Sequence, residues 1–350
     1  MTTKCVYAGS FCPPTYGHLR VVEEAAKIFE MVTVLCSENP NKKELPFTPE
    51  ECAELWKAYR LPKNVCVKTL RGVLKESADF GGVVLIRGIR NSDDFEDEKS
   101  VMQLNSKRFG INKYFYVMTG AEFAGVSSSK VRKLAEELQI EMLHQYVAPL
   151  VISRLLEKTL SIKNIVLVVG RPGSGKSTLL KILAEKSKTN AYINTDDFHD
   201  ALRPFLLKAF GSADIVKIAI ENREALAAVI APAWMEMLKD ALRKAPKGGN
   251  LFIEAAMGLQ PDKLLFRFVG GKVLYVGCEN NKELEKRITA RGNPQVIPFI
   301  TQIPDKDESK KVAEQYELCL GIVDTGCGKD GMETAAMNFD AAMGRGEIFG

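Results

Sequence analysis

The sequence lacks any long apolar run. Its longest apolar stretch, residues 225–235, is too short to span a bilayer and contains Pro232. The start of the chain also lacks the apolar segment of a secretory signal peptide. These absences exclude membrane-spanning transporters and channels, and we expect a soluble protein with no membrane partner.

Cysteine pairs at metal-binding spacing are absent as well. The eight cysteines are scattered, and five of them, Cys5, Cys12, Cys36, Cys52 and Cys66, lie mostly in apolar stretches. Such cysteines are typical of reduced, buried thiols and not of a disulfide framework or a zinc site. We therefore predict a reducing, cytoplasmic location.

The sequence also lacks a strong excess of charge of one sign. The formal net charge is only +4 over 350 residues, so it indicates neither a nucleic-acid nor a membrane-surface partner. Hydrophobic residues make up 46% of the chain and charged residues 26%, which is enough apolar material for ordinary cores. At roughly 150 residues per domain, this length predicts two domains.

Strand-like and helix-like segments alternate along residues 1–158. A short strand at residues 5–8, an amphipathic run with Val22 and Phe29 on one face, and a strand at residues 31–36 form a βαβ pattern. Further strands are predicted at residues 64–70, 83–86 and 114–117, and a helix with a capping box begins at residues 48–51. This alternation predicts an α/β domain whose parallel sheet is covered by helices.

The same alternation restarts after a closing helix, and we place the domain boundary near Thr159. The next strands are predicted at residues 165–169, 191–194, 251–253 and 272–276, followed by a helix that carries Arg287 and Arg291. We expect a second doubly wound parallel-sheet domain over residues 159–328. The tail, residues 329–350, has little periodicity, and we expect it to be loosely ordered or packed against a neighbouring part.

Residues 9–18, GSFCPPTYGH, directly follow the first strand and end at a predicted helix start. This arrangement would place backbone amides, a small hydroxyl and the His18 imidazole around one anion, and a nucleotide phosphate suits such a cradle. A lone histidine at a helix start is more often a cap or a core residue. The strand and turn directly before His18 favour a binding role here.

The first 158 residues resemble the bacterial phosphopantetheine adenylyltransferases, which are nucleotidyltransferases with a Rossmann-like fold. Besides residues 9–18, the resemblance rests on motifs in the same order and spacing. These are ENPNKK at 38–43, RGIR at 87–90 with DFE at 94–96, and VSSSKVR at 126–132. Thr15 bears on the substrate, because relatives that act on nicotinamide mononucleotide or cytidylyl substrates usually carry histidine there.

The resemblance implies that the phosphate of 4'-phosphopantetheine attacks the α-phosphorus of ATP and gives dephospho-coenzyme A and pyrophosphate, with Mg²⁺ on the phosphates. His18, Lys42 and Arg90 would stabilise the charge of the transition state. The pantetheine side would be bound by Ser10, Lys42, Leu74 and Arg87. The ATP side would be bound by Phe11, Thr15, His18, Gly88, Ile89, Arg90, Glu98, Phe123, Val126, Ser127, Ser128 and Ser129.

The sequence does not give the oligomeric state. Isolated enzymes of the resembled family form hexamers, so a homo-oligomer is possible, and the second domain would either decorate or block that assembly.

Cys12 departs from the family pattern, which usually has aspartate there. A thiol is smaller, normally neutral and a weak acceptor, so substrate or Mg²⁺ orientation could be weaker or activity lost. A nucleophilic Cys12 is a minor alternative, because the reaction needs no enzyme nucleophile.

Residues 170–177, GRPGSGKS, match the P-loop pattern GxxxxGK[ST] between a predicted strand and a predicted helix, which is the context the motif requires. The loop amides would surround the β-phosphate of ATP, Lys176 would contact the β- and γ-phosphates, and Ser177 would bind Mg²⁺. The predicted ATP-binding residues are Gly170, Arg171, Pro172, Gly173, Ser174, Gly175, Lys176, Ser177 and Thr178.

The residues after the P-loop favour a kinase. Asp196 follows a predicted strand beside the P-loop and is the candidate base for an acceptor hydroxyl. Glu254 ends another strand, where it could orient Mg²⁺ or cap a helix. Arg287 and Arg291 are typical of a lid over the transferring phosphate, although a solvated basic helix has the same pattern. The guanine-reading motif of GTPases is absent.

Residues 165–328 resemble dephospho-coenzyme A kinases, less closely than the first part resembles its family. The resemblance implies transfer of the γ-phosphoryl group of ATP to the 3'-hydroxyl of dephospho-coenzyme A, the product of the first domain. Two segments depart from that family: NTD at 194–196 replaces a fuller DAD, and AAM at 255–257 replaces a proline-rich segment. These departures leave the acceptor open.

Together the two resemblances predict a bifunctional enzyme of coenzyme A biosynthesis with small-molecule substrates, ATP as co-substrate and Mg²⁺ at both sites. One alternative is a nicotinamide mononucleotide adenylyltransferase fused to a ribosylnicotinamide kinase; Thr15 and residues 127–132 count against it. Another is a nucleotide-sensing regulatory protein with a decayed first half. The retained His18, Lys42, Arg87 and Arg90 count against that alternative.

Overall fold

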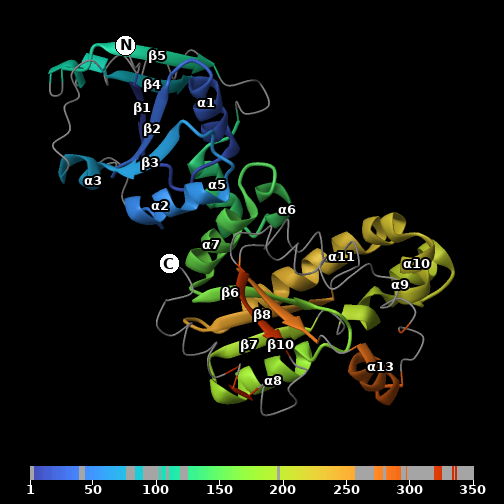
Figure 1. Ribbon diagram of the computed structural model, residues 1–350. Coiled ribbons are helices and arrows are strands. Elements are labelled where there is room, and N and C mark those ends of the chain that lie inside the picture. The colour runs from blue at the N-terminus through green and yellow to red at the C-terminus, as the bar shows by residue number, and fades with distance from the viewer. Residues whose placement is uncertain are drawn as a thin grey trace. The chain divides into compact units, whose positions relative to one another are not determined.

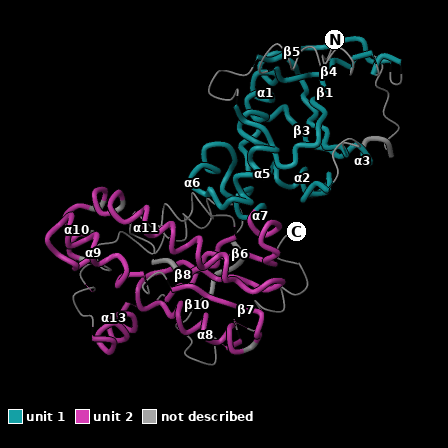
Figure 2. Tube along the Cα trace, turned by 180° about the vertical axis from the view of Figure 1, so that it is seen from behind, with its two compact units in different colours: residues 1–155 teal, residues 156–350 magenta. Residues whose placement is uncertain are grey.

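The computed structural model describes residues 4–38, 44–75, 83–89, 102–103, 105–107, 110–118, 125–194, 198–256, 272–278, 281–292, 297, 319–324, 333–334 and 336. The chain divides into two compact units, residues 1–155 and 156–350 (Figure 2). The described residues of each unit contain one sheet of five parallel strands (Figure 1). The prediction of two parallel-sheet α/β domains is therefore confirmed.

The sheet of unit 1 has the strand order β3-β2-β1-β4-β5. Its strands are β1 (Lys4–Gly9), β2 (Met31–Cys36), β3 (Val65–Thr69), β4 (Val84–Ile89) and β5 (Lys113–Met118). Both neighbours of β1 run parallel to it, with Cys5 opposite Val32 on one side and Val84 on the other. Strands β2 and β3 are added on one side of β1, and β4 and β5 on the other, so β1 is the topological switch point of the sheet. In open α/β sheets, ligands bind at the carboxyl end of the strands at such a point.

The helices that start in unit 1 include three that begin where the sequence predicts, at residues 16, 49 and 128. The helices are α1 (Tyr16–Ala26), α2 (Pro49–Leu55), the 3₁₀ turn η1 (Trp56–Ala58), α3 (Leu70–Lys75), α5 (Ser128–Glu136), α6 (Ile140–Leu143) and α7 (Pro149–Leu160). The capping box at Thr48 is present, because the Thr48 hydroxyl and the Glu51 carboxylate each accept a hydrogen bond from the backbone N–H of the other.

Unit 2 has the strand order β10-β9-β6-β8-β7, which puts the strand that leads into the P-loop at the centre of the sheet. Its strands are β6 (Asn164–Gly170), β7 (Asn190–Asn194), β8 (Asn250–Ala256), β9 (Lys272–Gly277) and β10 (Cys319–Asp324). Every residue of β6 is buried, as its apolar run predicts for a central parallel strand.

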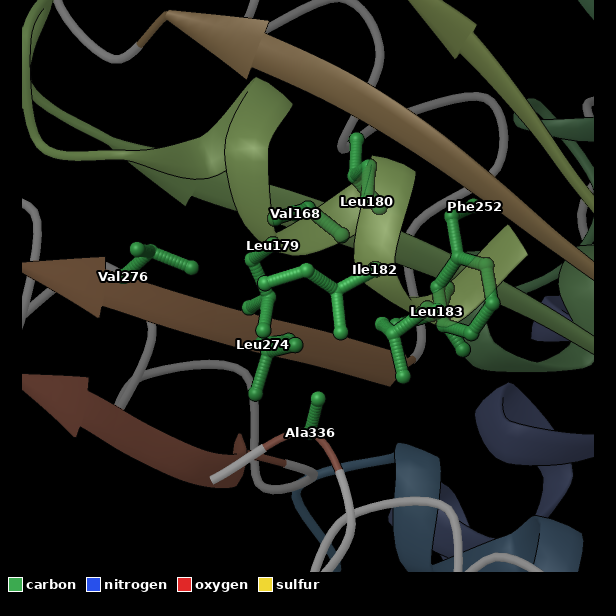
Figure 3. Packing of buried hydrophobic residues seen from close by; sticks show 10 residues of the cluster. Val168, Leu179, Leu180, Ile182, Leu183, Phe252, Leu274, Val276 and Ala336 are labelled. Carbon is green, nitrogen blue, oxygen red and sulfur yellow. The ribbon is translucent and has the colours of Figure 1, made fainter. Parts of the chain in front are cut away.

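The helices of unit 2 include a long insertion between β7 and β8. They are α8 (Lys176–Lys186), α9 (His199–Phe210), α10 (Ile215–Glu221), α11 (Arg223–Lys244) and α13 (Asn281–Ala290). Helix α8 packs on the sheet through a buried cluster shown in Figure 3. The cluster contains Val166, Val168, Leu179, Leu180, Ile182, Leu183, Phe252, Leu274, Val276 and Ala336. Ala336 comes from the predicted tail, so this part of the tail packs into the core of unit 2.

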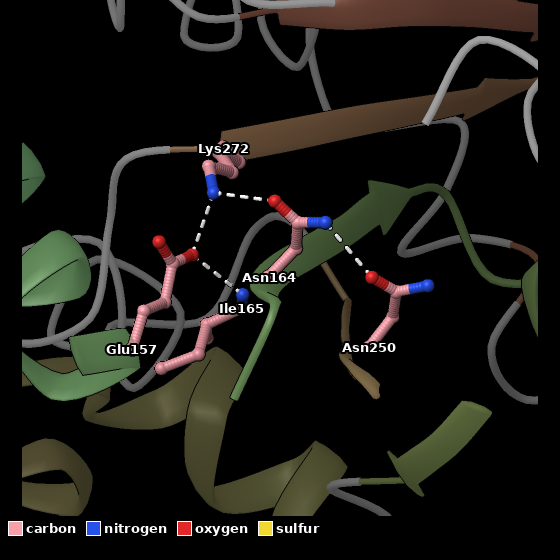
Figure 4. Close-up of polar contacts among 5 residues, drawn as sticks. All are labelled: Glu157, Asn164, Ile165, Asn250 and Lys272. Carbon is pink, nitrogen blue, oxygen red and sulfur yellow. Dashed lines mark hydrogen bonds and ion pairs between the residues drawn. The ribbon is translucent and has the colours of Figure 1, made fainter. Parts of the chain in front are cut away.

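A buried polar network crosses the amino ends of the strands of unit 2 (Figure 4). The Lys272 ammonium donates to the Glu157 carboxylate and to the Asn164 side-chain oxygen, each over 2.7 Å. Asn164 donates to Asn250 and Asn250 to Asn190, each over 2.8 Å. One carboxylate oxygen of Glu157 also accepts the backbone N–H of Ile165. The network fixes the last turn of α7 to four neighbouring strands.

Four of the five thiols predicted to be buried, Cys5, Cys12, Cys36 and Cys52, are buried and not in disulfides, whereas Cys66 is half-buried and also free. None of the helices in the described part of the chain is long and apolar enough to cross a membrane.

Candidate active sites

The first candidate site lies where β1 ends and α1 begins. Thr15 is the N-cap of α1, and its hydroxyl accepts the backbone N–H of His18 over 3.3 Å. In return, the backbone N–H of Thr15 donates to Nδ1 of His18 over 3.1 Å. This reciprocal capping box holds the His18 ring at the amino end of α1, where the helix dipole favours a negatively charged ligand.

The hydrogen bond to Nδ1 favours one tautomer of His18. A backbone N–H can only donate, so this hydrogen bond favours the tautomer in which Nδ1 is unprotonated and Nε2 carries the ring proton. The Thr15 hydroxyl also lies 3.1 Å from Nδ1 and can donate to it in the same tautomer. Nε2–H is then a hydrogen-bond donor. A donor at the amino end of a helix suits a phosphate oxygen.

The carbonyl groups of the loop before α1 are each held by a different side chain. The carbonyl of Cys12 accepts from Arg132 over 2.6 Å, and that of Pro13 accepts from Ser128 over 2.8 Å. The carbonyl of Pro14 accepts from Tyr59 over 2.9 Å. The motif at residues 126–132 therefore packs directly on the loop of residues 9–18.

The amino end of α5 adjoins this loop. Ser127 is the N-cap of α5, and its hydroxyl accepts the backbone N–H of Lys130. Ser128 donates to the loop carbonyl, and the Ser129 hydroxyl accepts from Arg132 over 3.2 Å. Capping by this serine run thus coexists with an exposed helix end that could contact a phosphate.

Phe11 has its ring in the core. Its φ of 43° is in the left-handed region, and its side chain is only 3% exposed. The ring makes edge contacts with Tyr7, His18 and Trp56, with ring centroids 4.9, 5.2 and 5.4 Å away. Phe11 therefore packs against the His18 ring from the core side, and a ligand could contact Phe11 only through its backbone.

Cys12 also has its side chain turned inward. Its thiol is 1% exposed and donates to the carbonyl of Phe47 over 3.7 Å. A hydrogen bond from Cys52 lowers the pKa of the Cys12 thiol, while the same contact and burial raise the pKa of Cys52. The thiol thus occupies a space between the loop and α2.

Strand β4 brings further predicted residues to the same edge of the sheet. Arg87 donates to the carbonyl of Ala8 over 3.2 Å, and Gly88 faces α1 so closely that a Cβ there would lie 2.9 Å from Val21. Ile89, the last residue of β4, is buried. Ser10 follows β1 directly, and Val126 directly precedes Ser127.

Several predicted residues of the first site lie outside the described residues. These are Lys42, Arg90, Glu98 and Phe123; Leu74 is in α3, but its side chain is not described. The described members that the fold brings to the loop between β1 and α1 come from β4 and α5 as well as from the loop itself. Arg132, the last residue of the 126–132 motif, contacts this loop too. So does Tyr59, for which the sequence offered no reason to assign it to the site.

The second candidate site is the loop between β6 and α8. A Cβ at Gly170 would clash with the carbonyl oxygen of Val276, so only glycine allows the approach of β9 at this point. Gly173 has a φ of +80° and lies against α13, where a Cβ would be 3.0 Å from Ile288. The glycines of the motif are therefore required by the backbone and by the neighbouring elements.

Lys176 and Ser177 meet a buried carboxylate at this loop. The Lys176 ammonium donates to the carbonyls of Gly170 and Arg171 over 3.0 and 3.1 Å, and lies 3.9 Å from the Glu254 carboxylate. The Ser177 hydroxyl donates to that carboxylate over 3.0 Å. Glu254 belongs to β8, which pairs with β6, and is 6% exposed. It therefore does not cap a helix, and its position beside Ser177 suits an Mg²⁺ ligand.

Helix α13 lies beside the P-loop. Arg171 donates to the side chain of Asn281 over 3.4 Å, and the space that a Cβ at Gly173 would occupy is bounded by Ile288. Arg287 is on the same helix and pairs with Glu283 over 2.9 Å. Arg291 was predicted to lie on the same helix as Arg287, but α13 ends at Ala290 and Arg291 directly follows it. Asp196 lies outside the described residues.

The family model and the relatives compared by sequence match the first unit. A family model described as cytidylyltransferase-like matches residues 6–134. Phosphopantetheine adenylyltransferase of Heliobacterium modesticaldum is 35% identical over 158 residues, which are 45% of this chain and 92% of that enzyme. The Corynebacterium efficiens enzyme of the same name is 37% identical over 134 residues, 38% of this chain and 84% of that enzyme.

Among solved structures, the crystal structure of TT1252 from Thermus thermophilus is similar with a TM-score of 0.38 and 20% sequence identity. The match covers 51% of this chain and 96% of that one. A crystal structure of NadR protein in complex with NAD and AMP-PNP matches over 98% of this chain and 97% of that one, with 14% sequence identity and a TM-score of 0.33.

Proposed function

Because the first part of the chain belongs to the phosphopantetheine adenylyltransferase family, we propose that unit 1 transfers the adenylyl group of ATP to 4'-phosphopantetheine. The observation that carries the proposal is the reciprocal hydrogen bonding of Thr15 and His18. It supports a role in which Nε2–H of His18 donates to an oxygen of the α-phosphate. That donation would stabilise the negative charge that builds up when the acceptor phosphate attacks.

Other residues of unit 1 have supporting roles in this proposal. The amino end of α5 with Ser127, Ser128 and Ser129 suits the outer phosphates of ATP. Arg87, at the carboxyl half of β4, suits the acceptor phosphate. Lys42 and Arg90 remain predicted charge-stabilising residues. No enzyme nucleophile is required, in agreement with the buried position of Cys12.

For unit 2 we propose ATP-dependent phosphorylation of a small molecule. The observation that favours a kinase is the contact of Ser177 with the Glu254 carboxylate beside Lys176. A hydroxyl and a carboxylate are oxygen ligands of the kind Mg²⁺ takes, so Ser177 and Glu254 would hold it. Bound Mg²⁺ would neutralise charge on the β- and γ-phosphates. Lys176 would exchange its loop carbonyls for phosphate oxygens, and Arg287 or Arg291 would add charge from the α13 side.

The acceptor that we propose for unit 2 is the 3'-hydroxyl of dephospho-coenzyme A, with Asp196 as the base that takes its proton. The support is chemical continuity, since this acceptor is the product proposed for unit 1. The chain would then be a bifunctional coenzyme A synthase with ATP as co-substrate of both steps.

One experiment tests both steps. The full chain is incubated with 4'-phosphopantetheine, ATP and Mg²⁺, and the products are followed by mass spectrometry for wild type, His18→Ala and Lys176→Ala. We expect coenzyme A from the wild type, dephospho-coenzyme A alone from Lys176→Ala, and neither from His18→Ala. Dephospho-coenzyme A that never gains a phosphate in the wild type would refute the second step only. If neither product forms, the adenylyltransferase proposal fails and a nucleotide sensor becomes the better account.

A further inference from the structure

The loop before α1 contains two successive prolines, Pro13 and Pro14, and so has no backbone N–H at either position. Its conformation therefore depends on the carbonyl groups, because these are the only backbone groups of the two prolines that can form hydrogen bonds. The last of them, the carbonyl of Pro14, accepts from the hydroxyl of Tyr59 over 2.9 Å.

Tyr59 is well placed to hold that carbonyl. Its side chain is 6% exposed, and its ring packs edge-on against Tyr16 and tilted against Trp56, with centroid distances of 5.5 and 5.7 Å. Its hydroxyl also accepts the backbone N–H of Ala148 over 3.4 Å. The hydroxyl thus has a fixed position, set by η1 on one side and by the start of α7 on the other.

The Pro14 carbonyl and the Thr15 N–H belong to one planar peptide group. In a trans peptide these two groups point in opposite directions, so a hydrogen bond that fixes the carbonyl also fixes the direction of the N–H. That N–H donates to Nδ1 of His18 over 3.1 Å, and the hydroxyl of the same residue, Thr15, lies 3.1 Å from Nδ1 as well. The hydroxyl of Tyr59 therefore fixes the direction of the backbone donor to His18.

We propose that Tyr59 is a positioning residue for His18, acting through the Pro14–Thr15 peptide. It keeps the proton of the His18 ring on Nε2 and keeps that nitrogen aimed at the ligand. A contribution of Tyr59 to catalysis rests on the adenylyl transfer proposed for unit 1, whereas its effect on the His18 ring does not depend on any activity.

The test compares Tyr59→Phe with Tyr114→Phe in the full chain. Both substitutions remove a hydroxyl that donates to backbone carbonyls, but the Tyr114 hydroxyl binds Ile111 and Met102 on a different part of unit 1. The first readout is the ¹⁵N spectrum of the imidazole rings without ligand. The chain has only three histidines, so the signals of His18 are identified by their loss in His18→Gln.

We expect the wild type and Tyr114→Phe to show His18 with its proton on Nε2, and Tyr59→Phe to show a mixture of tautomers. With ATP and 4'-phosphopantetheine, Tyr59→Phe should lower kcat about 10- to 100-fold, because a small misplacement of a reacting group has effects of this size. Its KM values should change by less than about threefold, since the groups that bind the substrates are unchanged.

Tyr59→4-aminophenylalanine, which keeps a donor at the end of the ring, should restore both the His18 signals and most of kcat. It also supplies the comparison if Tyr59→Phe does not fold. His18 signals in Tyr59→Phe that match the wild type would overturn the inference at any level of activity. Altered signals in a chain whose wild type makes no dephospho-coenzyme A would support the positioning role and refute the proposed reaction.

Discussion

The Lys272 ammonium and the Glu157 carboxylate form a buried ion pair, with 2.7 Å between Nζ and Oε1 and side chains only 1% and 4% exposed. Lys272 begins β9, and Glu157 lies in the last turn of α7. Two charges in a protein interior are stable only when they are paired and hydrogen-bonded, and Asn164 and the Ile165 N–H supply the remaining bonds. The carboxyl-terminal part of α7 therefore contributes to the stability of unit 2.

Glu157→Gln should destabilise unit 2 by about 3 kcal/mol, because the lysine stays buried and loses its negative partner. The measurement is urea unfolding in a Trp56→Phe background, in which Trp234 is the only tryptophan and reports on unit 2. Asp240→Asn is the control, since Asp240 and Arg243 form an exposed pair on α11 and its loss should change the stability by less than about 0.5 kcal/mol. Equal effects of the two substitutions would refute the role of the buried pair.

The sheets could be predicted from the sequence because each strand has a short apolar run with clear ends, and central strands such as β6 are apolar throughout. The site loops could also be predicted, since the glycines and the polar residues follow strands directly. The buried network could not. Asn164, Asn190 and Asn250 stand at strand starts, where asparagine is typical of turns, so only the parallel alignment of the three strands shows that their side chains meet.

Tyr59 and Glu254 illustrate the same limit at the two sites. Tyr59 follows a short 3₁₀ turn, 45 residues from the carbonyl it binds, and nothing in its own sequence neighbourhood indicates that contact. Glu254 stands 77 residues after Ser177. The sequence left open whether Glu254 binds a metal or caps a helix. The pairing of β8 with β6 places Glu254 beside the P-loop and so favours the metal-binding role.

Glu254→Gln should lower the phosphorylation of dephospho-coenzyme A by about 100-fold or more, because an amide binds Mg²⁺ less strongly than a carboxylate and keeps a similar shape. The rate is measured as coenzyme A formed from added dephospho-coenzyme A over a range of Mg²⁺ concentrations, and the variant should need more Mg²⁺. Adenylyl transfer by unit 1 in the same sample should be unchanged. Glu221→Gln is the matched control, because Glu221 forms an exposed ion pair with Lys217 on α10. A Glu254→Gln chain with normal Mg²⁺ dependence would rule out this residue as a ligand.

Cys12→Ala should retain adenylyl transfer within about threefold of the wild type. The thiol is buried and bonds to the Phe47 carbonyl, so it neither attacks a substrate nor binds a metal in the proposed reaction. The loss of a small buried side chain should lower the stability of unit 1 by about 1 kcal/mol. Initial rates with saturating substrates measure the first effect, and the unfolding midpoint of Trp56 fluorescence in a Trp234→Phe background measures the second. A fall in kcat of several hundredfold with intact folding would instead indicate a chemical role for the thiol.

The stability of unit 1 should fall at alkaline pH because of Cys36. Burial raises the pKa of the Cys36 thiol from its ordinary value of 9.0 to about 12. Above pH 9 the unfolded chain loses this proton while the folded chain keeps it, so the contribution is complete below about pH 9 and is lost as the pH rises to about 12. One proton changes the free energy of unfolding by about 1.4 kcal/mol per pH unit, so Cys36→Ala should flatten the slope by about this amount. Val34→Ala, an equally buried position on β2 without a titrating group, should lower the stability at every pH and keep the wild-type slope. A Cys36→Ala chain with that same slope would show that the thiol ionises no differently in the folded protein.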